Sequence, residues 1–269
     1  MKLNEFYSLL DGLAPKRLSD EYCCNTGAYD NSGILVDTGE DVKGVLFTLD
    51  LTNSALDEAM KIGANLIVTH HPVIYGKISD IRDGDLLGAK LIRCIKNGIS
   101  VVSMHLNLDV ARGGIDESLM QGICFSAGES KGAGTRVSLL CPLSDGAYGR
   151  AYDVKETTLG ALAEGMKKTF STDRILVYGD KAKTIKRVAS FCGAGADEGT
   201  LRFAKSEGAD VVVSSDFKHH LIGYALEEGM QVIVLTHYAS EQYGFRKYYE
   251  KMRQQTSIPC VYHTEDGLF

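Results

Sequence analysis

The chain has 269 residues and a formal net charge of −6. This acidic balance argues against nucleic acid or an anionic membrane surface as the main partner. Hydrophobic residues make up 44% of the chain and charged residues 24%, as in a globular protein with a core of ordinary size, and the length is enough for one large or two ordinary domains.

Cysteine usage and the N-terminus both predict a cytoplasmic protein. The seven cysteines are irregularly spaced and include no CxxC pair, which indicates reduced thiols rather than a disulfide framework. The first residues, MKLNEFYSLLDGLAP, lack the apolar centre of a signal peptide. No segment approaches the roughly 20 apolar residues of a membrane-spanning helix.

Apolar segments that alternate with helical patterns predict an α/β fold. The predicted strands are 44–51, 64–69, 99–104, 174–179, 186–192, 209–214 and 231–236. The predicted helices are 54–62, 84–97, 157–169, 199–207, 219–228 and 241–255. Most of the strands are continuous apolar runs, which is typical of mainly parallel sheets covered on both faces. Ser54 is expected to cap its helix, and Gly63 and Gly98 stand where helices should end.

A change in composition predicts two domains. Residues 126–150 are rich in glycine and serine and show little regular pattern. We expect a first α/β domain of residues 1–125 plus 235–269, which carries most of the candidate ligands, and a second α/β domain of residues 126–234 inserted into it.

Histidines and carboxylates gather where three of the predicted strands end. Strand 64–69 leads into His70 and His71, strand 99–104 into His105 and Asp109, and strand 231–236 into His237 and Glu241. The carboxyl ends of strands are where α/β sheets bind ligands. One histidine at a strand end is usually structural, but four histidines and two carboxylates form a suitable ligand set for two divalent ions. Two such ions can polarise a substrate and make a water molecule more acidic.

Six short motifs together resemble one protein family. They are DNSG at 30–33, LDLT at 49–52, IVTHHP at 67–72, HLNLD at 105–109, GGIDESL at 113–119 and HYASE at 237–241. In order, spacing and residue type they resemble the NIF3 family, also described as the GTP cyclohydrolase I type 2 or YbgI-like family. The likeness is good over 27–120 and 209–245 and loose over 126–200. The family often has tryptophan where this chain has Tyr29.

This resemblance implies a dinuclear metal centre in the cleft between two α/β domains. It places the family's ligands on the same six residues, His70, His71, His105, Asp109, His237 and Glu241. It also implies a toroidal homohexamer and hydrolysis of a nucleotide, as in GTP cyclohydrolase chemistry. Zinc, iron, manganese, cobalt and nickel all suit the ligands. The alternative is a non-catalytic metal-binding hexamer with a regulatory or protein-interaction role.

Four further residues are candidates for supporting the ligands or lining the pocket. Asp30 and Asn31 could face the site or hold a loop through an Asx-turn. Asp50 and Thr52 could hydrogen-bond a ligand histidine, although capping of the helix that starts near Ser54 is the favoured interpretation.

Other polar groups have structural alternatives. Asp216, Lys218, His219 and His220 are interpreted as pocket or surface residues, and His263 as structural. The glycines of FCGAGADEG at 191–199 could cradle a phosphate, or they could form a tight turn capped by Asp197. The tyrosines of helix 241–255 indicate packing or an oligomer interface.

Overall fold

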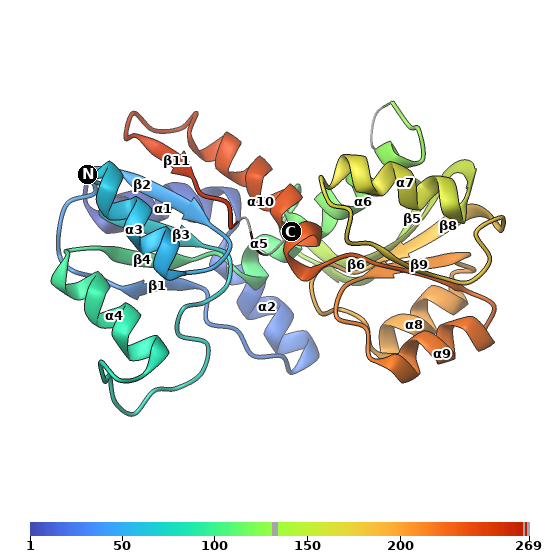
Figure 1. Cartoon of the computed structure of the whole chain (residues 1–269), viewed down its shortest axis with the longest axis horizontal. Helices are drawn as coiled ribbons and strands as arrows, with labels where there is room; N and C mark the ends of the chain where they lie inside the picture. Colours follow the sequence, from blue (N-terminus) through green and yellow to red (C-terminus); the bar gives the residue numbers. More distant parts are fainter. Residues whose placement is uncertain (131–133, 266, 268–269) are drawn as a thin grey trace. The chain divides into compact units, whose positions relative to one another are not determined.

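The computed structural model describes residues 1–130, 134–265 and 267, which form two compact units (Figure 1). Unit 1 contains Met1–Ala111 and Phe245–Glu265, and unit 2 contains Arg112–Gly244. The predicted domains, 1–125 plus 235–269 and 126–234, likewise nest one part of the chain within the other. Their limits stay a prediction.

Unit 1 is built on a five-stranded sheet in the order β1-β4-β3-β2-β11. Its strands are β1 (Gly33–Val36), β2 (Val45–Thr48), β3 (Leu66–Thr69), β4 (Ser100–Ser103) and β11 (Cys260–Tyr262). Its helices are α1 (Leu3–Leu13), α2 (Lys16–Thr26), α3 (Asn53–Ile62), α4 (Leu86–Lys96) and α5 (Leu106–Val110). All strand pairs are parallel except β1 with β4. In register, Thr48 pairs with Thr69 and Thr69 with Ser103, so β2, β3 and β4 end side by side.

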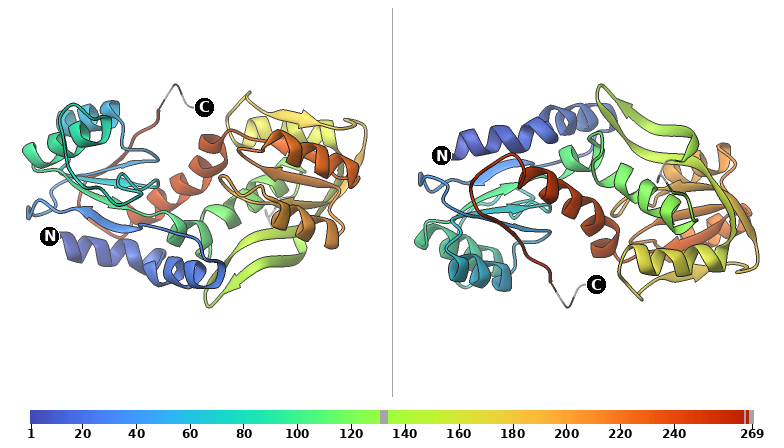
Figure 2. Two further views of the ribbon diagram at one scale, coloured as in Figure 1. Left: turned by 90° about the horizontal axis from the view of Figure 1, so that it is seen from below. Right: turned by 90° about the horizontal axis from the view of Figure 1, so that it is seen from above.

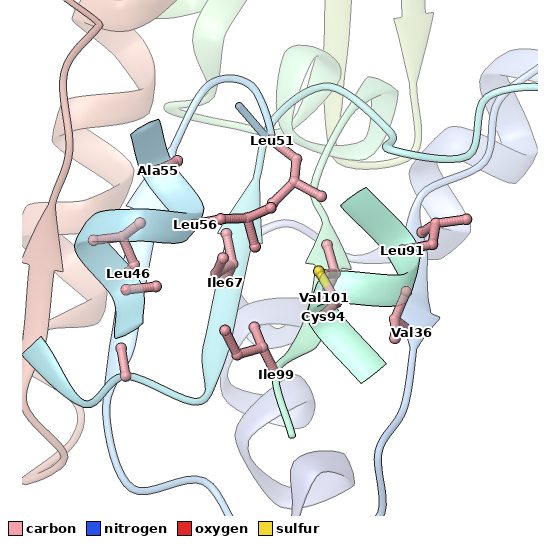
Figure 3. Close-up of a cluster of buried hydrophobic side chains, with 12 residues drawn as sticks. Val36, Leu46, Leu51, Ala55, Leu56, Ile67, Leu91, Cys94, Ile99 and Val101 are labelled. Atoms are coloured by element: carbon pink, nitrogen blue, oxygen red, sulfur yellow. The ribbon is translucent and has the colours of Figure 1, made fainter. Parts of the chain in front are cut away.

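Helices α3 and α4 cover one face of this sheet. Their apolar side chains, including Leu56 and Leu91, form one buried cluster with Ile67 of β3 and Val101 of β4 (Figure 3). Helix α3 is capped by Thr52, whose hydroxyl accepts a hydrogen bond from the Ala55 amide. The cap was expected at Ser54. The helix ends at Gly63 in the left-handed conformation, as predicted. Burial of this apolar stripe stabilises the layer that carries the strand ends.

The opposite face of the same sheet is covered by α1 and by the last turns of α10 (His237–Met252). Figure 2 shows α1 on the side of the sheet away from α3 and α4. Phe47 of β2 packs against the rings of Phe245, Tyr248 and Tyr249, and the Tyr248 hydroxyl donates to the Leu10 carbonyl over 3.1 Å. These aromatic residues of α10 are therefore core residues of unit 1.

Unit 2 is built on a six-stranded sheet in the order β5-β6-β8-β9-β10-β7. Its strands are β5 (Thr135–Leu143), β6 (Gly146–Thr158), β7 (Leu176–Tyr178), β8 (Thr184–Ser190), β9 (Val211–Ser214) and β10 (Gln231–Val234). Its helices are α6 (Ile115–Ser126), α7 (Leu159–Thr169), α8 (Glu198–Ser206), α9 (His219–Glu227) and the start of α10. Helices α6 and α7 lie on one face of the sheet, and α8 and α9 on the other (Figure 1).

The α/β class is confirmed, and every predicted strand and helix has a counterpart in the described part of the chain. The mainly parallel pairing expected of both sheets is found in unit 1. The sheet of unit 2 is mixed, because β8-β9 and β9-β10 are parallel and its other pairs are antiparallel. The low regularity expected of 126–150 is wrong, because β5 and the start of β6 form a hairpin there. Most residues of β5 are exposed or half-buried, so no apolar pattern marks it.

Neither membrane spans nor disulfides are found in the described residues. No described helix combines the length and hydropathy needed to cross a membrane. All seven cysteines lie in the described part of the chain, and none of them forms a disulfide.

Candidate metal centre

His70 and His71 are held at the end of β3 by backbone hydrogen bonds to the neighbouring strand. The amides of both residues donate to the Leu49 carbonyl, over 3.1 and 2.9 Å. The Thr69 hydroxyl donates to the His71 carbonyl over 2.8 Å and contacts the Ser103 hydroxyl. The two rings then lie next to each other, with centroids 4.8 Å apart, so the double histidine is fixed by strand pairing.

His105 and Asp109 are presented by the end of β4 and one turn of helix. His105 precedes α5, and the Asp109 amide donates to the His105 carbonyl over 2.9 Å. A spacing of four residues places both side chains on the same face of a helical turn. Asp109 is 5% exposed and His70 is fully buried.

Three of these side chains converge within unit 1. One ligand atom each from His70, His105 and Asp109 lies within 4.8 Å of the others, and His70 Nε2 is 3.6 Å from Asp109 Oδ1. His71 adjoins the group, its ring centroid 5.9 Å from that of His105. The structure therefore brings together the four unit 1 residues that the sequence selected.

The Nδ1 atom of each candidate histidine in unit 1 contacts a hydrogen-bond acceptor. His70 Nδ1 lies 2.8 Å from the Met104 carbonyl, His71 Nδ1 lies 2.8 Å from Asp50 Oδ1, and His105 Nδ1 lies 2.7 Å from Asp30 Oδ1. An acceptor at Nδ1 fixes the tautomer and presents Nε2 as the ligating nitrogen, which is the usual arrangement of metal-binding histidines.

Asp30 makes several further hydrogen bonds. It accepts hydrogen bonds from the hydroxyls of Ser19 and Ser32, each over 2.5 Å, and from the Ser32 amide over 3.3 Å. Burial on its own raises the pKa of Asp30, but the hydrogen bonds from His105, Ser19 and Ser32 outweigh it, so the pKa lies well below its usual value. The Asx-turn and the contact with the histidine ligand are thus both present.

Unit 2 presents a second pair of candidate ligands on the first turn of α10. His237 Nε2 lies 3.0 Å from Glu241 Oε1, and the two residues are four apart on the helix. His237 Nδ1 lies 2.5 Å from Asp216 Oδ2, which repeats the pattern of unit 1. Glu241 is 3% exposed, so its carboxylate is held in a defined place.

The donor chemistry fits divalent metal ions. Imidazole and carboxylate together suit zinc, iron, manganese, cobalt and nickel, and buried carboxylates beside histidine Nε2 atoms are costly to hold unless a cation or hydrogen bonds compensate them. The candidate ligands are His70, His71, His105 and Asp109 in unit 1, and His237 and Glu241 in unit 2.

The remaining residues singled out in the sequence make structural contacts or lie at the surface. Asn31 donates to the Ile74 carbonyl over 2.6 Å, which anchors the segment after the double histidine. Thr52 caps α3 and also hydrogen-bonds Glu265. His219 and His220 are exposed at the start of α9. His263 contacts Ser54 and Glu265, a structural role as expected.

Asp216 is the main residue whose role the sequence interpretation did not identify. It was considered only as a surface or pocket residue, yet it contacts His237 Nδ1. A signal was available, because Asp216 and His237 follow β9 and β10, which are adjacent and parallel. Met104 and Ser19 carried no such signal, since one acts through its backbone carbonyl and the other lies on α2.

Comparison with known proteins decides the family. The model of the Duf34/NIF3 (NGG1p interacting factor 3) family matches residues 1–265. The chain belongs to the Duf34/NIF3 family. The resemblance inferred from six short motifs is therefore confirmed, and it covers nearly the whole chain rather than the motifs alone.

Other members of the Duf34/NIF3 family agree in length and fold. A Clostridium perfringens protein named "GTP cyclohydrolase 1 type 2 homolog" is 30% identical over 258 residues, which cover 95% of this chain and 92% of the relative. A Clostridium acetobutylicum protein of the same name is 28% identical, covering 90% and 85%. The crystal structure of a Bacillus cereus protein related to NIF3 superposes with a TM-score of 0.82 at 20% identity, over 100% of this chain and 99% of that one, which shows a shared fold.

Proposed function

We propose that this protein is a metal-dependent hydrolase that acts on a nucleotide or another phosphorylated metabolite, with two divalent ions per chain. One observation carries the proposal: the Nδ1 atoms of all four candidate histidines contact acceptors, namely the Met104 carbonyl, Asp50, Asp30 and Asp216. A core histidine needs no such uniform arrangement, whereas a metal ligand does. The name of the relatives supports hydrolysis of a purine nucleotide as the reaction to test first.

The ligands proposed are His70, His71, His105, Asp109, His237 and Glu241. When bound, divalent ions polarise a substrate oxygen or nitrogen and increase the acidity of water. The chain's own contribution is orientation: Asp30, Asp50 and Asp216 keep a proton on the Nδ1 atom of their histidines, so that Nε2 presents its lone pair. Asp109 and Glu241 supply negative charge beside those nitrogens, which favours cations over neutral ligands.

Metal content tests this proposal. Elemental mass spectrometry of the purified protein should give about two divalent ions per chain, with loss in His70→Ala and Glu241→Ala. His219→Ala is the matched control, because its histidine is exposed on α9. No more than trace metal in the wild type, even after incubation with divalent ions, would contradict the site.

Turnover is then measured on a nucleotide panel with the bound metal. Specific hydrolysis of one nucleotide that disappears in His105→Ala would support catalysis. Weak activity on many phosphoesters would not, because loosely bound metal gives the same result.

A second function has one observation in its favour, namely that the family description names an interaction rather than a reaction. In this alternative the protein is a non-catalytic, metal-binding homohexamer with a regulatory or protein-interaction role. A metal-loaded protein that turns over no nucleotide in the panel would favour it. Light scattering tests the assembly, since a hexamer has about six times the 29.2 kDa chain mass.

A further inference from the structure

The turn that follows β8 lies against both candidate ligands of unit 2. We call residues 192–196 the Gly193 turn. Gly193 adopts a left-handed backbone conformation with a φ of +57°. The sequence FCGAG first indicated either a phosphate-binding loop or a tight turn, but the contacts of Gly193 indicate a different role.

Gly193 leaves no space for a side chain. A Cβ atom at this position would lie 2.5 Å from Glu241 Oε1 and 3.5 Å from His237 Nε2. Cβ atoms do not approach other atoms to 2.5 Å, so either the turn or the carboxylate would have to move. A side chain at residue 193 would displace the Glu241 carboxylate or the turn, so the bare backbone of Gly193 allows the carboxylate to lie where it does.

Hydrogen bonds from the sheet hold the turn in place. The Gly193 carbonyl accepts from the Ser215 amide over 3.2 Å and from the Ser214 hydroxyl over 3.3 Å. Both serines are fully buried. Because Ser214 is the last residue of β9 and Ser215 follows it, the turn cannot shift without breaking bonds to the end of this strand.

Asp116 of α6 holds the start of the turn. Its Oδ1 accepts from the Cys192 amide over 3.3 Å, and its Oδ2 accepts from the Gly149 amide over 3.1 Å and pairs with Arg150. Asp116 is fully buried and Arg150 is 4% exposed. This one carboxylate connects α6, β6 and the Gly193 turn, which makes the turn a rigid support.

We propose that Gly193, supported by Asp116, is a positioning residue that sets the distance between Glu241 Oε1 and His237 Nε2. Both atoms are candidate ligands. Because they lie 3.0 Å apart, both could bind the same metal ion. The effect on metal binding depends on the proposed function, whereas the effect on the position of the carboxylate does not.

The alternative is that glycine is needed here only for its positive φ. Three variants separate the two explanations. Gly193→Ala adds a Cβ and also strains the backbone. Gly193→Asn adds a Cβ, but asparagine tolerates the left-handed region. Gly208→Ala strains the backbone in the same way, since Gly208 has a φ of +71° and open space where a Cβ would lie.

The first measurement is a crystal structure of Gly193→Ala grown with a chelator. We expect the Glu241 carboxylate to have turned away, beyond hydrogen-bond distance of His237 Nε2, while the hydrogen bonds of Asp116 persist. A carboxylate that stays in place, with no shift of the turn, would overturn the proposal whether or not the protein binds metal.

The second measurement is titration with Co²⁺, followed by its visible absorption. Gly193→Ala and Gly193→Asn should bind at least about tenfold more weakly than wild type, the scale of effects from residues that orient ligands. Gly208→Ala should bind as wild type does. Equal weakening in Gly208→Ala, or recovery in Gly193→Asn, would show that only the backbone conformation matters. Failure of the wild type to bind Co²⁺ would contradict the proposed function, and the crystal structure would still decide the role of Gly193.

Discussion

Asp30 and His105 are 75 residues apart in the sequence, yet Asp30 Oδ1 lies 2.7 Å from His105 Nδ1. The same carboxylate is held by the hydroxyls of Ser19 and Ser32, and Ser32 also accepts from the His105 amide over 3.1 Å. The ring and the backbone of His105 are thus both oriented by the DNSG motif. The DNSG motif, which contains no candidate ligand, therefore acts on a candidate ligand through these contacts.

Replacing Asp30 with asparagine should weaken metal binding by about 10- to 100-fold. An amide is a weaker acceptor, and it can turn its NH₂ group towards Nδ1. That favours the tautomer with a proton on Nε2, which cannot ligate. Affinity is measured by competition with a chelator. Asp83→Asn is the control, because Asp83 is exposed in the same unit, and an equal loss in both variants would contradict the role of Asp30.

Replacing Asn31 with alanine should release the segment after the double histidine. The Asn31 side chain donates to the Ile74 carbonyl across 43 residues of sequence, and residues 71–85 contain no helix or strand. We expect faster amide hydrogen exchange in peptides covering 72–85 and little change in the thermal midpoint. Asn97→Ala, which loses only a bond within α4, should leave that exchange unchanged. Protected amides in the Asn31 variant would disprove the anchor.

The convergence of the candidate histidines could be expected from the sequence because His70, His105 and His237 each come shortly after a strongly apolar strand. A parallel strand delivers the residue after it to one edge of the sheet, so His70, His105 and His237 could be assigned without knowing which strands are neighbours. The residues that orient them were harder to assign. Asp50 follows the adjacent strand β2, but Asp30 precedes β1, the one antiparallel strand of unit 1.

The role of Gly193 and the hairpin of unit 2 could not be predicted from the sequence. A glycine after a strand has many explanations, and only the position of Glu241, 2.5 Å from where a Cβ of residue 193 would lie, selects one. The hairpin was missed because β5 buries little, so its pairing with β6 is specified by the partner strand and not by its own apolar pattern.

Glu265 should contribute to stability in a pH-dependent way. Burial raises the pKa of Glu265, but hydrogen bonds from Thr52, Ser54 and His263 outweigh it, so the pKa lies below the ordinary value of 4.5. A carboxylate with a lowered pKa stabilises the fold above its ordinary pKa, and this contribution is lost as the pH falls through the lowered value.

Replacing Glu265 with glutamine should therefore cost about 1 kcal/mol of unfolding free energy at pH 7, and this cost should shrink as the pH falls below 4.5 and through the lowered pKa. Denaturant unfolding with a chelator present measures the difference without any contribution from bound metal. Glu250→Gln, which removes an exposed pair with Arg253, should change little across this pH range. A deficit for Glu265→Gln that does not change between pH 7 and the acid end of the native range would show that the charge is not responsible.

The Asp116–Arg150 pair should be among the most costly contacts of unit 2 to break. Both side chains are at most 5% exposed, and removing one partner leaves the other as a buried uncompensated charge. Arg150→Met should lower the unfolding free energy by about 3–5 kcal/mol. Arg112→Met is the matched control, since its pair with Asp145 is exposed and should contribute less than about 1 kcal/mol.

A double variant tests whether the charges of Asp116 and Arg150 interact. Asparagine at 116 removes the charge that Arg150 neutralises and keeps one acceptor oxygen, so it retains only one of the two bonds from the amides of Gly149 and Cys192. Asp116→Asn combined with Arg150→Met should therefore be less destabilised than the sum of the single variants, by about 1–3 kcal/mol. Strict additivity would mean that the two charges do not interact. The stability of unit 2 would then depend on the hydrogen bonds to the Gly193 turn and not on the ion pair.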